Sequence, residues 1–280
     1  TDIAMKYLAD KFREMKDIPY AKLSIVMQYY VRVYELSQEK NNTTLLSNAS
    51  DEGIRYVSNL LEQADSQLSK AIDSFLHYCL AEFFFAKTYC DEGLDSYYYA
   101  VKAIEEYDMS FSLFNIKLPV YSSKKMDKYP SINFDSPSDL QSLAAYLCNT
   151  YGECFSKAAR GCSKEKDIDW DKNYLKDLQQ KAIFYCEYAV KWSETDNQTY
   201  LRNLGCALEA HYGEEGYTTD DIRNKISETY QRAMDISIID KKESYKVFYT
   251  WLSFEHRCAD RIFDKHISKD KKEIIRWLYR

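Results

Sequence analysis

Glycine and proline are scarce in this sequence, which has 7 Gly and 4 Pro among its 280 residues. Average usage gives roughly 20 glycines and 14 prolines for a chain of this length. Tight turns and the connections between strands consume both residue types. The shortage therefore disfavours a β-sandwich, a β-barrel or a glycine-rich nucleotide-binding fold, and it predicts an all-α chain with long helices.

Motifs that carry catalytic or metal chemistry are also missing. The sequence contains no HExxH, no GxSxG and no P-loop. It has only four histidines, and none of its eight cysteines belongs to a CxxC pair. Free, buried thiols in a reducing compartment explain the cysteines better than disulfides or a zinc site. We therefore expect no metal, no cofactor and a cytoplasmic location.

The charge balance and the hydrophobic runs limit the partners. The net charge is -6 and the pI is about 5.4, whereas nucleic acids and anionic membranes attract proteins with a basic face. The 38 lysines and arginines still allow a local basic patch. The most apolar stretch, residues 76–90, is too short to cross a bilayer and contains Glu82 and Lys87. We expect a protein or peptide partner, and neither a membrane nor a nucleic acid.

Apolar spacing and capping residues predict the helices of the N-terminal part. Residues 1–17 and 19–38 are predicted helices, the second with apolar residues at i, i+3 and i+4 spacing. The polar residues 40–50 are a predicted loop. Ser50 is then the predicted N-cap of a long helical region that runs to about Asp91, with a break near Ser66 as the alternative. Gly93 is a predicted helix stop. A further helix is expected to carry the aromatic residues that follow Gly93.

Residues 109–137 differ from the rest of the chain. They hold three of the four prolines and an alternating run from Phe111 to Leu118. Long segments without secondary structure are uncommon inside a compact domain. The sequence therefore predicts an N-terminal helical bundle over 1–108, an irregular linker or long loop over 109–137 and a C-terminal region over 138–280. A small strand pair in the alternating run is the alternative.

A repeated pattern of large and small residues marks the C-terminal region. The helices expected there span about 138–160, 171–192, 197–213, 219–237, 242–266 and 269–280. The pattern large-x2-Leu-Gly-x2-large, or a close variant, occurs at Leu201-Leu204-Gly205-Leu208, Tyr245-Phe248-Tyr249-Leu252 and Leu140-Leu143-Ala144-Leu147. A second pattern, Ala-x3-large-x2-Ala or close to it, occurs at Ala182-Cys186-Ala189 and Ile226-Tyr230-Ala233. The related alanines Ala189 and Ala233 are 44 positions apart.

These patterns resemble the tetratricopeptide repeat family over about residues 138–266, and more weakly over 70–108. The resemblance implies antiparallel helical hairpins that stack into an α-solenoid, with small residues where helices approach closely. The repeats depart from the family because they are about ten residues longer than its roughly 34, and because the proline after the second helix is absent. Two generic amphipathic hairpins in an irregular bundle are the alternative.

The resemblance implies a function as a protein-interaction or scaffold module, as part of a larger protein, without enzymatic activity. In such arrays the first helices of the hairpins line a concave surface, and their exposed positions contact the partner. The positions implied here are Gln141, Asn149, Arg202, Glu209, Lys246, Thr250 and Ser253. Their mixed charge favours a peptide or protein ligand. The alternative is that these side chains are only solvated, or covered by the chain's own long loop.

One element points to a different function. Arg261 and His266 form an R-x4-H element, which resembles the active-site signature of HEPN ribonucleases. That resemblance implies metal-independent RNA cleavage by these two residues, usually in a dimer. The family has a polar residue directly after the arginine, where this chain has Ile262. The alternative is a solvated helix face on which Arg261 pairs with Asp264, three residues later.

Overall fold

The computed structural model describes residues 20–39, 42–63, 69–114, 118–122, 138–164, 170–193, 197–240 and 244–266. Within these residues the chain forms ten helices and no strand, so the predicted all-α class is confirmed. The helices expected over 1–17 and 269–280 lie outside the described residues. The helices are α2 (Tyr20–Gln38), α3 (Thr43–Gln63), α4 (Lys70–Lys87), α5 (Gly93–Phe114), α6 (Ser138–Lys164), α7 (Lys172–Trp192), α8 (Gln198–Tyr212), α9 (Glu214–Thr218), α10 (Asp220–Asp240) and α11 (Ser244–His266).

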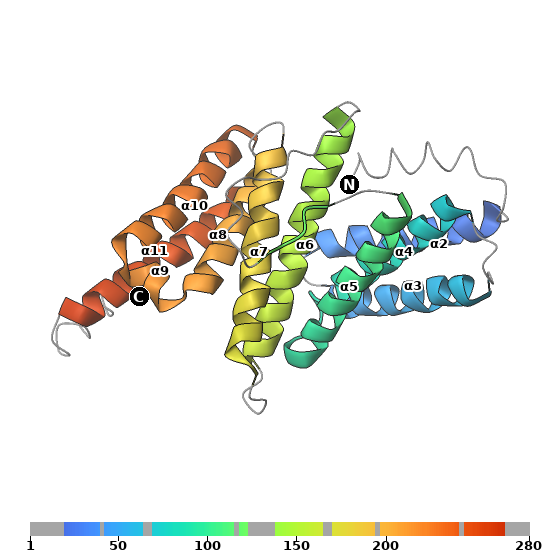
Figure 1. Ribbon diagram of the computed structural model, residues 1–280, viewed down its shortest axis with the longest axis horizontal. Coiled ribbons are helices and arrows are strands. Elements are labelled where there is room, and N and C mark those ends of the chain that lie inside the picture. Colours follow the sequence, from blue (N-terminus) through green and yellow to red (C-terminus); the bar gives the residue numbers. More distant parts are fainter. Residues whose placement is uncertain are drawn as a thin grey trace.

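The helices follow one another along the longest axis of the molecule (Figure 1). Helices α2 to α5 lie at one end, α6 and α7 form a long pair in the middle, and α8 to α11 lie at the other end. Packing is mainly between neighbours in sequence, and α8 packs on α10 across the short α9. Helix α8 also contacts α6 and α11. Three helices that are not consecutive are thereby brought next to one another.

The predicted loop over 40–50 is wrong, because α3 begins at Thr43. Ser50 is a buried residue inside this helix, and its hydroxyl donates to the carbonyl of Leu46 at 2.8 Å instead of capping an N-terminus. Serine can satisfy its hydroxyl in this way within a helix. The polar composition of residues 40–50 suggested a loop. The segment from Thr43 is helical because one face of α3, which includes Leu46 and Gly53, is buried against α4.

Gly93 begins a helix and does not end one. Its φ of 60° reverses the chain between α4 and α5, a conformation that glycine adopts without strain. Helix α5 then continues to Phe114, so residues 109–114 of the predicted linker are helical, and the strand alternative is wrong for them. The alternation of Phe111 with polar residues was misleading, because Phe111 stacks on Tyr107 at i, i+4 spacing with ring centroids 5.7 Å apart. Residues 118–122 are irregular, as predicted.

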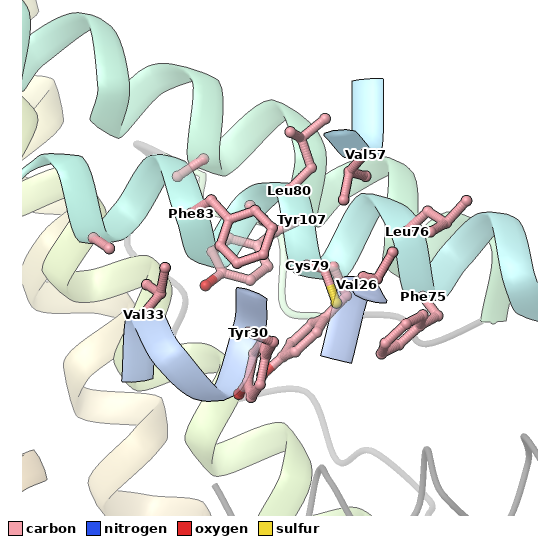
Figure 2. Close-up of a cluster of buried hydrophobic side chains, with 14 of the residues drawn as sticks. Val26, Tyr30, Val33, Val57, Phe75, Leu76, Cys79, Leu80, Phe83 and Tyr107 are labelled. Carbon is pink, nitrogen blue, oxygen red and sulfur yellow. The ribbon is translucent and has the colours of Figure 1, made fainter. Parts of the chain in front are cut away.

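A large buried cluster joins the first helices of the chain (Figure 2). Tyr30 of α2, Val57 of α3, Phe83 of α4 and Tyr107 of α5 point into it. A Cβ added to Gly53 would lie 2.7 Å from the ring of Phe83, so α3 and α4 can approach this closely only because residue 53 has no side chain. Burial of these large side chains accounts for the packing of the N-terminal helices.

The same cluster continues into α6, on the far side of the predicted linker. Leu143, Leu147 and Tyr151 of α6 belong to it. The hydroxyl of Tyr107 donates to Glu82 of α4 at 2.7 Å. The division of the chain into domains at 109–137 stays a prediction, but helices before and after that segment share one buried core.

The C-terminal helices meet in a second buried cluster, which includes Ala182 of α7, Tyr230 of α10 and Phe254 of α11. A Cβ added to Gly205 of α8 would lie 2.5 Å from a ring atom of Tyr230. The close approach of helices expected at Gly205 is therefore present. Ala189 and Ala233, the small residues of the second pattern, are both fully buried.

All eight cysteines are free, and six of them are buried, as the spacing predicted. None of the described helices combines the length and the apolar character needed to cross a membrane. Burial raises the pKa of several of these thiols, including that of Cys162 to about 11. The buried thiols act as small apolar side chains within the core.

An ionic contact between α4 and α5 makes stability depend on pH. Nδ1 of His77 lies 2.6 Å from Glu106, and Nε2 lies 3.5 Å from Asp73. The hydrogen bond to Glu106 raises the pKa of His77 above 6.5 in the folded state. This contribution to stability is fully present below pH 6.5 and is lost as the pH rises through the raised pKa. We expect His77→Gln to destabilise the chain more at about pH 6 than at about pH 9, measured by urea denaturation. An equal loss at both pH values would contradict this assignment.

Candidate partner-binding surface

The seven predicted partner-binding residues lie on α6, α8 and α11. Two of these helices are joined by buried asparagines. Nδ2 of Asn203 on α8 donates to Oδ1 of Asn149 on α6 at 3.0 Å. Arg202 donates to the same Asn203 side chain at 3.1 Å. Asn149 and Arg202, both predicted from the sequence, are thus linked through a residue that the prediction did not include.

Gln141 lies apart from these residues and has a partner within the fold. Its Nε2 donates to the backbone carbonyl of Trp192 at 3.1 Å. Trp192 is the last residue of α7, and the last carbonyls of a helix have no partner within that helix. Gln141 therefore stabilises the C-terminus of α7, at one end of the surface.

Glu209 holds four helices together. Its carboxylate forms an ion pair with Arg257 of α11 at 2.6 Å. It also accepts hydrogen bonds from Tyr217 of α9 at 2.7 Å and from Tyr230 of α10 at 3.2 Å. Burial, together with this hydrogen bond, raises the pKa of Tyr217 to about 12. The phenol therefore stays a donor at neutral pH, and the carboxylate of Glu209 has partners on three sides.

The three predicted residues of α11 share one helix face. Lys246, Thr250 and Ser253 are half-buried and have i, i+4, i+7 spacing. The Thr250 hydroxyl donates to the carbonyl of Lys246 at 2.7 Å. One turn further along α11, the same face carries Arg257, which contacts α8 through Glu209. The three predicted residues of α11 therefore lie on the same helix face as Arg257, which joins α11 to α8.

The sequence prediction missed a polar group at the other side of the surface. Nζ of Lys157 lies 3.9 Å from the ring centroid of Tyr89 and 3.5 Å from the carbonyl of Thr88. The Tyr89 hydroxyl donates to Glu153 at 3.1 Å. Glu153 and Lys157 continue the helix face of Asn149 at i+4 and i+8, so periodicity could have found them. Tyr89 comes from the turn after α4, and no signal in the sequence places it beside α6.

Charges of both signs act on the Lys157 ammonium group. Burial and, to a smaller extent, the neighbouring charge of Arg160 lower the pKa of Lys157 to about 8, while the charge of Glu153 opposes the shift. Burial raises the pKa of the Cys206 thiol on α8, and the positive charges of Arg202 and Arg160 counteract this rise.

The R-x4-H element is only partly within the described side chains. Arg261 forms an ion pair with Glu214 of α9 at 2.7 Å, and both side chains are exposed to solvent. The side chain of His266 lies outside the described residues. How Arg261 and His266 lie relative to each other, and hence the ribonuclease hypothesis, stays a prediction.

Comparisons of this chain with models of known protein families, with curated proteins and with solved structures found no match.

Proposed function

We propose that this chain is a protein-interaction module that binds a peptide or protein partner on the surface formed by α6, α8 and α11. The observation that carries the proposal is the contact network of that surface. Asn149 and Arg202 are joined through Asn203, and Glu209 of α8 is joined to Arg257 of α11. Polar side chains thus join α6 to α8 and α8 to α11, which supports a shared surface of mixed charge on these three helices.

The proposal includes a tetratricopeptide-like stacking of the C-terminal hairpins into an α-solenoid. In its support, α6 packs on α7, α7 on α8, α8 on α10 and α10 on α11, while α8 also contacts α6 and α11. Such alternate contacts arise when helical hairpins stack in one direction, because every second helix then lies on the same side. Gly205 supplies the close approach that this packing needs.

Capture of partners by the purified chain tests the function. We expect the double variant Arg202→Gln, Lys246→Gln to recover its partner at least about tenfold less than the wild type does, since each substitution removes a charge from the surface. Quantitative mass spectrometry of the co-purified proteins measures the recovery. Circular dichroism should show an unchanged melting temperature.

The matched control is the double variant Lys102→Gln, Lys172→Gln, which removes two charges from α5 and α7. Lys102 lies 2.7 Å from Glu105 on its own helix, and Lys172 is the exposed first residue of α7. The control should capture the partner as the wild type does. Equal capture by the wild type and by the Arg202, Lys246 variant would exclude this surface as the binding site.

A further inference from the structure

The carboxylate of Glu82 on α4 lies among tyrosines of the large buried cluster. Its Oε1 accepts two hydrogen bonds, from the hydroxyl of Tyr107 on α5 at 2.7 Å and from that of Tyr146 on α6 at 3.3 Å. Tyr107 is fully buried within the cluster of Figure 2, and Tyr146 packs against this cluster. One carboxylate oxygen therefore joins helices that precede and follow the segment 109–137.

The side chains packed around Glu82 are aromatic and uncharged. Tyr78 precedes Glu82 by one turn on α4 and is 4% exposed. Its ring centroid lies 6.3 Å from that of Tyr30 on α2 and 5.9 Å from that of Tyr107. In the described part of the chain, no lysine, arginine or histidine side chain forms an ion pair with Glu82. A negative charge on this side chain is therefore stabilised mainly by phenol hydroxyls.

A buried charge with ionic partners lies on the same helix. Lys87 is 5% exposed, and its Nζ lies 3.2 Å from Asp51 and 3.5 Å from Asp91. Burial lowers the pKa of Lys87, but the two carboxylates raise it above 10.5 overall. At Glu82, burial raises the pKa above 4.5, whereas the phenol hydrogen bonds and the charge of the N-terminal amino group lower it by less. The surroundings of Lys87 thus favour its charged form, and those of Glu82 favour its neutral form.

We propose that Glu82 is a proton-controlled contact, whose protonation strengthens the attachment of α4 to α5 and α6. The charged carboxylate costs free energy in the folded chain alone, because unfolding returns it to water. A proton on Oε2 removes this cost and leaves Oε1 as the acceptor for both phenols. The folded chain thus binds the proton more tightly than the unfolded chain. The contribution of Glu82 to stability is greatest at about pH 4.5 and below, and it falls as the pH rises through the raised pKa.

The titratable side chains that face Glu82 stay neutral between pH 4.5 and pH 8. Burial first, and then the charge of neighbouring carboxylates that include Glu82, raises the pKa of each of them above its ordinary value. They are the phenols of Tyr30, Tyr78, Tyr107 and Tyr146 and the thiols of Cys79 and Cys154. His77 of α4 also titrates near neutral pH, but its ion pairs are with Asp73 and Glu106. The effect of Glu82 can therefore be separated from that of His77 by substitution.

Urea denaturation of the full chain at pH 5 and pH 8 tests the contact. Glu82→Gln keeps the shape of the protonated side chain and cannot ionise. The urea midpoint of Glu82→Gln, relative to that of the wild type, should rise by roughly 0.5 M between pH 5 and pH 8. The matched control Glu105→Gln removes an exposed carboxylate of α5 that lies 2.7 Å from Lys102, and its difference from the wild type should change by less than about 0.1 M. A difference between Glu82→Gln and the wild type that is the same at both pH values would overturn the proposal.

The same comparison in the His77→Gln chain removes the other pH-dependent contact between α4 and α5. The double variant His77→Gln, Glu82→Gln is then measured against His77→Gln alone. Because the two groups have separate partners, the pH-dependent difference caused by Glu82→Gln should remain. Its disappearance in this chain would assign the pH dependence to His77 and would exclude Glu82 as the proton-controlled contact.

A direct titration distinguishes a proton-binding carboxylate from a merely structural one. Carbon NMR of the full chain labelled at glutamate Cδ follows Glu82, whose resonance is the one missing from Glu82→Gln or, where that variant does not fold, from Glu82→Asp. Its titration midpoint should lie above pH 4.5. Tyr107→Phe removes a donor to the carboxylate and should move the midpoint to higher pH. Tyr98→Phe, which changes an exposed ring of α5, should leave it in place. A midpoint at or below pH 4.5, or one that Tyr107→Phe does not move, would contradict the proposal.

Discussion

Gly205→Val is expected to destabilise the chain by about 3 kcal/mol or more, because it inserts a side chain where α8 and α10 are in contact. A Cβ at position 205 would lie 2.5 Å from Cε1 of Tyr230. The Tyr230 ring is fully buried, and its hydroxyl is held by Glu209 at 3.2 Å and by the Cys206 sulfur at 3.5 Å. The ring therefore cannot move aside, and the helix would have to shift.

The smaller substitution Gly205→Ala keeps this prediction testable where the valine variant does not fold. Alanine is favoured over glycine in a helix by up to about 1 kcal/mol. A net loss of stability in Gly205→Ala would therefore be due to the steric clash between the added Cβ and the Tyr230 ring. The control is Gly216→Ala, whose Cβ would meet mainly the flexible end of the Ile226 side chain, at 3.1 Å. Urea denaturation followed by circular dichroism measures both. A Gly205→Ala chain as stable as the wild type would show that α8 and α10 do not meet as described.

Tyr151→Ala is expected to cost about 3–5 kcal/mol, the range found when a buried aromatic residue is replaced by alanine. Tyr151 is 3% exposed. Its ring centroid lies 5.9 Å from that of Tyr107 on α5 and 5.2 Å from that of Tyr185 on α7. The substitution removes side-chain contacts from three successive helices at once.

The same variant tests the predicted division into domains. Circular dichroism follows the helices of the whole chain, whereas Trp170, Trp192 and Trp251 report by fluorescence on the region after residue 137. If α5 and α6 belong to one cooperative unit, Tyr151→Ala should shift both signals to the same lower urea concentration. Two separate transitions would favour independent domains. The control Tyr98→Ala removes a side chain of α5 that is 51% exposed, and its effect should stay within about 0.5 kcal/mol.

The candidate surface was predictable in part. The repeat pattern placed Asn149, Arg202 and Glu209 on helices that the fold brings into contact, because residues at fixed spacing share one helix face. Lys157 and Arg160 were missed, although they continue the face of Asn149, because the family resemblance directed attention to other positions. Tyr89 could not have been found, since its contact with Lys157 joins residues 68 positions apart.

The sequence by itself determined the helical class and most helix ends, because the forces involved act within one or two turns. Asp171 and Asn197 show this, since their side chains accept hydrogen bonds from backbone amides at 2.9 Å at the starts of α7 and α8. Only the tertiary structure decided that α3 begins at Thr43 and that α5 continues to Phe114. Burial against other helices stabilises these segments, and burial depends on residues far away in the chain. The same is true of the contact between Lys157 of α6 and Tyr89 from the turn after α4.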